Sequence, residues 1–72
     1  VVTPGLVNTP HHLCQTLTRA RAQEADLFTW LRELYPVWAG LDAESEYAAA
    51  RTGLAELALS GCSTVFDHHY VF

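Results

Sequence analysis

Two short β-prone runs lie near the two ends of the chain, and the sequence between them has a mainly helical pattern. The runs cover residues 1–9 and 63–68 and are rich in valine, threonine and other strand-favouring residues. No hairpin signal connects them, so a tight antiparallel turn is excluded. A long connection containing helices is instead typical of a βαβ crossover between parallel strands. The sequence therefore predicts an α/β fold.

Three helices are expected in the connection, over residues 12–22, 27–35 and 43–60. The second is the clearest, because Asp26 is a suitable N-cap and the apolar residues recur at helical spacing. They are Leu27, Trp30, Leu31, Leu34, Tyr35 and Trp38. Pro36 is expected to end or kink this helix.

The third helix has Asp42 as its expected N-cap and Gly61 as the glycine that follows its end. Its composition, rich in alanine and leucine, favours helix. The residues expected on its buried side are Tyr47, Ala50, Leu54, Leu57 and Ala58. The expected strands and helices together predict one small, partial domain over residues 1–72.

Composition narrows the range of partners. The chain has four arginines, no lysine and a net charge of −4, so we expect no nucleic-acid binding through phosphates. No apolar stretch approaches the length of a membrane span, so we expect no membrane association. Cys14 and Cys62 form no disulfide framework, and reduced cysteines predict a cytoplasmic location. The chain begins with Val1 rather than methionine and ends on the apolar run Tyr70-Val71-Phe72. We therefore expect it to be a piece of a longer protein.

All four histidines follow the two predicted strands, as His11-His12 and as His68-His69. Carboxyl ends of neighbouring parallel strands meet at one edge of a sheet, where ligands and metals commonly bind. Imidazole suits zinc or iron, so the pairs predict a metal site at this edge. The alternative is that each pair is an ordinary surface or hydrogen-bonded core feature. Asp67 can be a ligand, a general base, an orienting partner for a histidine, or simply a cap after the strand.

Three further residue groups have both a functional and a structural interpretation. Gln15 lies one helical turn after His12, and its amide can both donate to and accept from a heterocycle; otherwise it is a solvated side chain. Trp30 and Trp38 are interpreted as core residues rather than a stacking platform. The two cysteines have no activating base nearby in sequence and are interpreted as small apolar residues.

The stretch Pro4-Gly5-Leu6-Val7-Asn8-Thr9, followed by histidines, resembles the first metal-binding strand of the amidohydrolase superfamily. That strand has the pattern Pro-Gly-hydrophobic-hydrophobic-Asn/Asp-x-His-x-His. Later stretches are similar to the branch that contains guanine and 8-oxoguanine deaminases and triazine hydrolases. These stretches are His11 to Arg19, Leu27 to Leu31, Leu34 to Trp38 and Leu57 to Tyr70.

The resemblance implies a fragment, the first βα units, of a metal-dependent (β/α)₈ TIM barrel. It implies one divalent metal, Zn²⁺ or Fe²⁺, in each full-length active site, and a metal-activated water that deaminates a guanine-like or 8-oxoguanine-like purine. His12 matches the second histidine of the motif and is the expected metal ligand. His11 is the less favoured alternative, because neighbouring strand residues point to opposite faces. Gln15 matches a substrate-contacting position, and His68 and His69 are further candidates for substrate binding.

Two features depart from the family pattern. Pro10 replaces the expected first ligand histidine, and proline cannot bind a metal. The remaining ligands and the acid/base groups of such a barrel belong to later strands. We therefore expect the 72-residue chain itself to be inactive, with no catalytic residue of its own.

Two other hypotheses stay open from the sequence. The four histidines can form a non-enzymatic metal-binding module. Alternatively, the helices with Trp30 and Trp38 can make the chain a structural or interaction fragment, and self-association into a homo-oligomer would cover the edges of its sheet.

Overall fold

The computed structural model describes residues 1–70. The element order is β1 (Leu6–His11), the 3-10 helix η1 (Leu13–Thr18), α1 (Leu27–Trp38), α2 (Ala43–Leu59) and β2 (Cys62–Asp67). The two strands are hydrogen-bonded in parallel. This confirms the predicted crossover and the α/β class.

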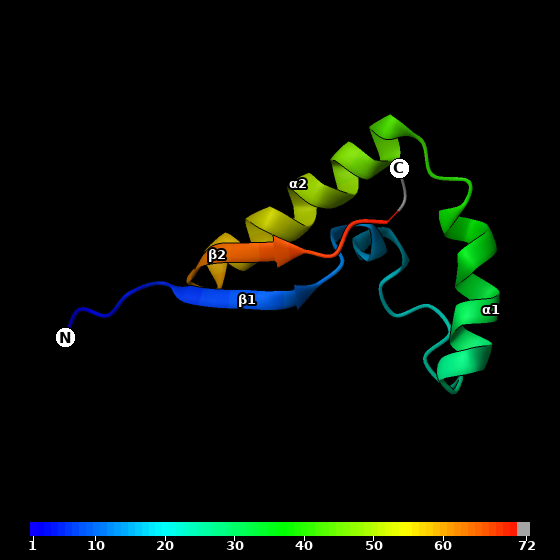
Figure 1. Ribbon diagram of the computed structural model, residues 1–72, viewed down its shortest axis with the longest axis horizontal. Coiled ribbons are helices and arrows are strands. Elements are labelled where there is room, and N and C mark those ends of the chain that lie inside the picture. The colour runs from blue at the N-terminus through cyan, green and yellow to red at the C-terminus, as the bar shows by residue number, and fades with distance from the viewer. Residues whose placement is uncertain (71–72) are drawn as a thin grey trace.

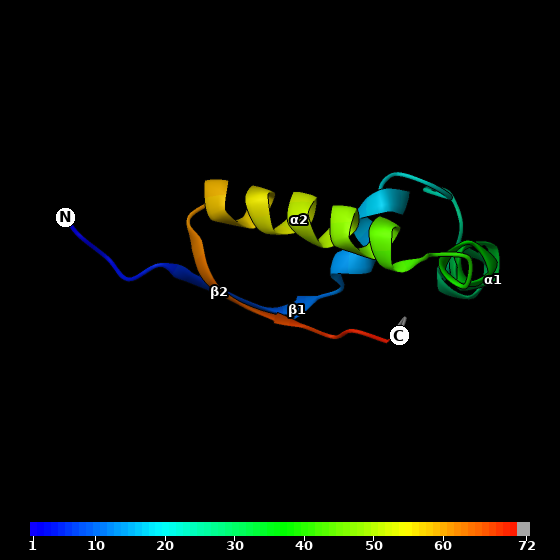
Figure 2. The ribbon, with the colours of Figure 1, turned by 90° about the horizontal axis from the view of Figure 1, so that it is seen from above.

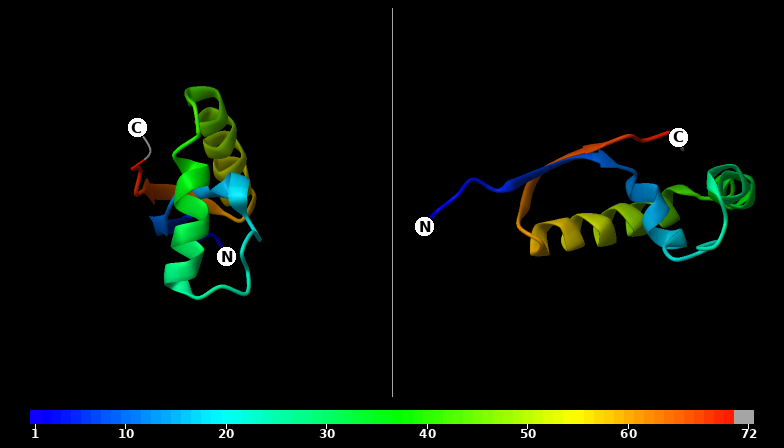
Figure 3. Two further views of the ribbon diagram at one scale, coloured as in Figure 1. Left: turned by 90° about the vertical axis from the view of Figure 1, so that its right-hand side faces the viewer. Right: turned by 90° about the horizontal axis from the view of Figure 1, so that it is seen from below.

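The elements form two layers and a projecting end. Helices α2 and η1 lie over one face of the two-stranded sheet, and no element within residues 1–70 covers the other face (Figure 2). Figure 3 shows the same layering from below and from the end. Helix α1 stands beyond the carboxyl ends of the strands (Figure 1). No helix within residues 1–70 is both long enough and apolar enough to cross a membrane.

Strand β1 begins later and ends later than predicted. Residues 1–5 carry no strand, and pairing starts where the Leu6 amide donates to the Gly61 carbonyl at 2.9 Å. Gly5 lies so close to Ser63 that a Cβ at this position would overlap the serine side chain. The register shifts between Asn8 and His11, at the segment that contains Pro10. Proline has no amide hydrogen to give to a ladder, so an irregular segment is where a strand tolerates it.

Two helix predictions were wrong in their extent. The helix expected over residues 12–22 is a single 3-10 segment that stops at Thr18, because the chain turns through positive φ at Ala20 (66°) and Ala22 (56°). The helix expected to end at residue 35 continues to Trp38. Pro36 has no amide hydrogen, so only the hydrogen bond that residue 36 would donate is lost. The Ala39 amide still donates to the Tyr35 carbonyl at 2.9 Å, so the helix continues past the proline.

The helix caps follow the sequence closely. The Asp26 and Asp42 carboxylates each accept a 2.8 Å hydrogen bond from the amide three residues later, so both N-cap predictions are confirmed. Helix α2 ends at Leu59, and Gly61 then takes a φ of 91° that favours glycine. This turn directs the chain into β2.

The core lies where η1 packs against both α1 and α2. Leu34 and Trp38 have exposed fractions of 0% and 2%, and Leu13 and Cys14 of η1 are also buried. The Trp38 indole nitrogen donates to the Thr18 hydroxyl at 3.0 Å, which satisfies the one polar atom of the ring. The interpretation of Trp38 as a core residue is confirmed.

The side of α2 that is buried differs from the prediction. Ala49 and Gly53 are its buried residues, whereas Tyr47 and Leu54, expected inside, are exposed. Helix η1 approaches α2 so closely that a Cβ on Gly53 would lie 2.8 Å from the nearest methyl of Leu13. Only small residues fit this contact, so the larger apolar residues of α2 turn away from it.

Candidate metal and substrate site at the strand ends

The predicted meeting of the histidines at one edge of the sheet is confirmed. His11 lies opposite Asp67 in the parallel register, and the His68 amide donates to the His11 carbonyl at 2.9 Å. The rings of His12 and His68 have their centroids 5.5 Å apart. The two strand ends therefore bring residues 56 positions apart in sequence into contact.

His12 has a defined protonation pattern. Its Nδ1 lies 2.8 Å from the backbone carbonyl oxygen of His68, which can only accept a hydrogen bond. Nδ1 therefore carries the hydrogen, and Nε2 of the neutral ring keeps a lone pair. Metal-binding histidines commonly have this arrangement, in which the nitrogen that does not bind the metal donates to a carbonyl or carboxylate.

His68 and His11 are held differently. The Nε2 atom of His68 donates to the Thr9 carbonyl at 3.0 Å, and its ring packs edge-to-face on Phe66. His68 therefore ties the end of β2 to the irregular segment of β1. His11 is half-buried, and its Nδ1 is enclosed without a hydrogen-bond partner.

Asp67 serves as a cap in this structure. Its Oδ1 accepts a 2.9 Å hydrogen bond from the Leu13 amide at the start of η1, 54 positions away, so it satisfies the beginning of another element rather than capping the end of its own strand as the alternative interpretation expected. Its Oδ2 lies 3.8 Å from Nδ1 of His69, and the same nitrogen lies 3.5 Å from Oε1 of Glu46. His69 thus stands between two carboxylates, one from β2 and one from α2.

The described residues do not complete a metal site. Within residues 1–70, no three His, Cys, Asp or Glu side chains are arranged to hold a metal ion. His12 fits the role of a single ligand, because its Nε2 carries the lone pair. Any metal site that uses His12 would need ligands from outside this stretch.

Gln15 reaches the same edge of the sheet, but its partner was not expected. Its Nε2 donates to the Tyr70 hydroxyl at 2.8 Å. The Tyr70 ring packs edge-on against His12, with centroids 5.4 Å apart, and faces Trp38 at 6.4 Å. Sequence reasoning missed both Tyr70 and Glu46 as members of this cluster, although an aromatic residue directly after a histidine pair was a usable signal.

Burial changes the acidity of two groups at this edge. It is the main reason that the pKa of the Cys14 thiol lies above its ordinary 9.0, and the carboxylates of Glu46 and Asp67 raise it further. Burial likewise raises the pKa of Tyr70 above its ordinary 10.0. Both groups therefore remain protonated at neutral pH.

These pKa values predict a loss of stability in alkali. The unfolded chain releases the Cys14 proton near pH 9.0, whereas the folded chain retains it to higher pH. The free energy of unfolding should therefore fall as the pH rises above about 9. Urea unfolding across this range measures the effect, and Cys14→Ala should lessen the fall whereas the control Cys62→Ala should not. An equal pH dependence in all three chains would contradict the assignment.

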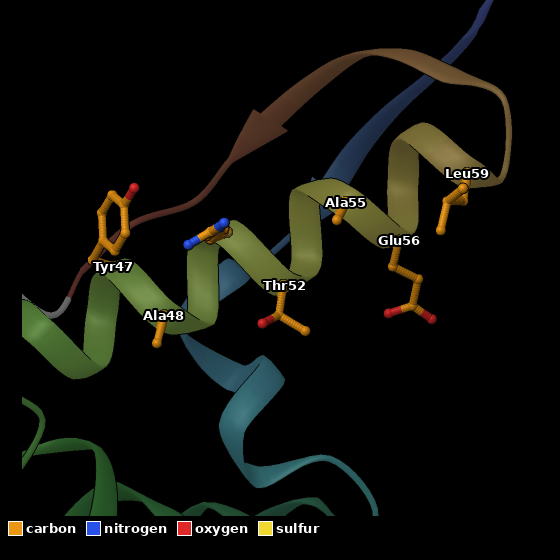
Figure 4. Close-up of a pocket in the computed structure, with 7 residues that line it drawn as sticks. Tyr47, Ala48, Thr52, Ala55, Glu56 and Leu59 are labelled. Carbon is orange, nitrogen blue, oxygen red and sulfur yellow. The ribbon is translucent and has the colours of Figure 1, made fainter.

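A separate hollow lies along α2 and has no histidine in its lining (Figure 4). Its lining includes the charged residues Arg51 and Glu56, and Glu56 already pairs with Arg19. The lining residues are Tyr47, Ala48, Arg51, Thr52, Ala55, Glu56 and Leu59. None of these resembles a ligand set or an acid/base pair, so the strand ends remain the candidate site.

Comparison with known proteins agrees with the geometry. Residues 1–71 match the model of the amidohydrolase family. Over its whole length the chain is 60% identical to the 8-oxoguanine deaminase of Pseudomonas aeruginosa, and the matched stretch makes up 16% of that protein. It is also 45% identical, over its whole length, to an isoxanthopterin deaminase from an unknown prokaryotic organism, of which the matched stretch makes up 16%. A hydroxydechloroatrazine ethylaminohydrolase of Pseudomonas sp. (strain ADP) is 42% identical over 93% of this chain and 15% of its own length.

The chain therefore spans about one sixth of the length of these curated relatives. No solved structure matches it significantly.

Proposed function

The chain belongs to the amidohydrolase family, and from that premise we propose that it is part of a hydrolase that deaminates a nitrogen heterocycle. The observation that carries the proposal is the meeting of His12 and His68 at the carboxyl ends of two parallel strands, with the Gln15 side chain connected to His12 through Tyr70. Relatives named as deaminases or aminohydrolases support hydrolysis of a C–N bond as the reaction class.

The proposed substrate is a purine of the guanine or 8-oxoguanine kind. The 60% identity to an 8-oxoguanine deaminase over the whole chain supports this choice. So does Gln15, whose amide is the hydrogen-bonding group suited to the edge of such a ring. His68 and His69 remain proposed as neighbours of the substrate rather than as reacting groups.

We further propose that His12 contributes one ligand, through Nε2, to a single Zn²⁺ or Fe²⁺ ion in the longer protein. The Nδ1–H of His12, which donates to the His68 carbonyl, supports this assignment. When bound, such an ion lowers the pKa of a water molecule and so supplies a nucleophile near neutral pH. The chain's own part is to hold His12 in its orientation and to place Gln15 beside it.

The isolated chain is proposed to be inactive. Residues 1–70 include no group of three side chains arranged to hold a metal, and the complete barrel that the family fold implies is about 250 residues long. Hydrolysis by this chain alone would therefore lack the groups that activate water and transfer its proton.

The test is an assay of ammonia release from guanine, 8-oxoguanine and an amino-triazine. The 72-residue chain should release none. A longer protein that includes this chain should release ammonia from a purine, at least once Pro10 is changed to histidine, and His12→Ala should abolish that activity. Ammonia release that does not depend on His12, or none from any of the three rings, would contradict the proposal.

A further inference from the structure

We propose that the hollow along α2 is a groove through which two copies of this chain pair. In this pair the two α2 helices lie antiparallel across a twofold axis, and Arg51 of each copy faces Glu56 of the other. The inference does not depend on the proposed function, because the groove has no histidine in its lining.

The groove lies on a part of α2 that the rest of the described chain leaves open. Helix α2 buries Ala49 and Gly53, and Gly53 closely approaches η1. Every residue that lines the groove belongs to α2 and is exposed (Figure 4). The lining is mainly apolar, and its residues Tyr47 and Leu59 have exposed fractions of 69% and 90%. Exposed apolar surface with polar residues around it is typical of a site that meets another protein.

The order of charges along the groove is complementary to itself. In an antiparallel pair whose twofold axis passes between Gly53 and Leu54, Arg51 of one copy stands opposite Glu56 of the other. The twofold axis repeats this contact, so two cations each meet an anion. A parallel pair would instead place Arg51 opposite Arg51 and Glu56 opposite Glu56, which is repulsive. The charges therefore favour a second copy of this chain, in the antiparallel orientation.

The apolar residues of the groove fit the same axis. It places Ala48 opposite Leu59 and Thr52 opposite Ala55, so the largest aliphatic side chain of the lining meets one of the smallest. Counted from Ala48, the other three fall at i+4, i+7 and i+11, a spacing that keeps side chains on one side of an α-helix. Small side chains at such a contact suit helix axes about 8–10 Å apart.

Both charged residues are available for this contact. Within residues 1–70 Arg51 makes no ion pair. Glu56 receives hydrogen bonds from Arg19, one on each carboxylate oxygen. Each oxygen has a second lone pair, so the Glu56 carboxylate can also accept from a second guanidinium. Pairing would thus extend the existing Arg19–Glu56 contact into a row of three charges, anion in the middle.

The first measurement is sedimentation equilibrium of the 72-residue chain. Because one helix face is smaller than a standard interface of about 20–30 residues a side, the dimer should be weak. We expect its dissociation constant to lie below about 1 mM. Arg51→Glu should raise this constant by at least about tenfold, because both ion pairs are replaced by like charges. Arg32→Glu is the matched control, since it reverses the charge of an exposed arginine on α1 and should leave the constant unchanged.

The second measurement mixes two variants that cannot pair with themselves. Glu56→Arg should prevent self-pairing as Arg51→Glu does, because each groove then carries charges of one sign. In an equimolar mixture of the two variants, every contact across the twofold axis joins opposite charges again. The mixture should therefore form dimers that contain one chain of each kind. A folding defect in either variant cannot produce this recovery.

Three outcomes would overturn the inference. A chain that stays monomeric at about 1 mM would show that the groove does not hold a second copy. Association that Arg51→Glu leaves unchanged, or that Arg32→Glu weakens equally, would place the contact elsewhere, for example at the open edges of the sheet. A mixture of Arg51→Glu and Glu56→Arg chains that stays monomeric would refute the antiparallel pairing of these two residues.

Discussion

Trp38→Ala should abolish the cooperative unfolding of the 72-residue chain. Trp38 is one of the largest buried side chains, with an exposed fraction of 2%, and it packs against Trp30, Tyr35 and Tyr70. Truncation of a buried tryptophan costs about 3–5 kcal/mol. A chain of this size rarely has more than about 3–5 kcal/mol of stability from its core. Urea or thermal unfolding followed by circular dichroism measures the change.

Two control variants separate burial from hydrogen bonding in this prediction. Phe28→Ala removes an aromatic ring from the same helix at an exposed fraction of 73%, and it should change stability little. Trp38→Phe keeps most of the buried surface but loses the indole donor to Thr18, so its cost should be intermediate. A Trp38→Ala chain as stable as Phe28→Ala would show that this core is not formed.

The parts of the fold that sequence predicted are those set by local chemistry. The caps at Asp26 and Asp42 and the turn at Gly61 follow from short-range preferences, and the structure has all three. Parallel pairing followed from the absence of a hairpin signal. The common edge for His12 and His68 then followed from topology alone, without any knowledge of packing.

The errors come from tertiary contacts. Whether Gly53 or Leu54 faces inward depends on the close approach of η1, and η1 itself is shorter than its leucine spacing suggested. The partner of Gln15 is Tyr70, 55 positions away, and no local pattern indicates a contact at that separation. The cap role of Asp67 likewise depends on where Leu13 lies in space.

Pro10→His in a longer protein that includes this chain should have the largest effect on function. If the proposed metal site is correct, the change supplies the ligand that the family pattern has at this position. Loss of even an outer contact to a metal ligand typically costs about 10–100-fold in affinity. A restored ligand should therefore raise metal affinity by at least about 100-fold and raise turnover with it, as measured by competition with a chelator and by ammonia release.

The structure favours this outcome on two grounds. Residue 12 has extended backbone, with φ −133° and ψ 93°, and positions 10 and 12 have the two-residue spacing at which side chains of an extended segment share a face. Pro10 is exposed and lies where the pairing of β1 is irregular, so a new amide hydrogen at position 10 should disturb little of the ladder. Thr9→His, one position earlier, adds the same imidazole toward the opposite face and should leave metal affinity unchanged. Equal gains from both variants, or none from Pro10→His, would show that His12 does not belong to a two-histidine motif in this register.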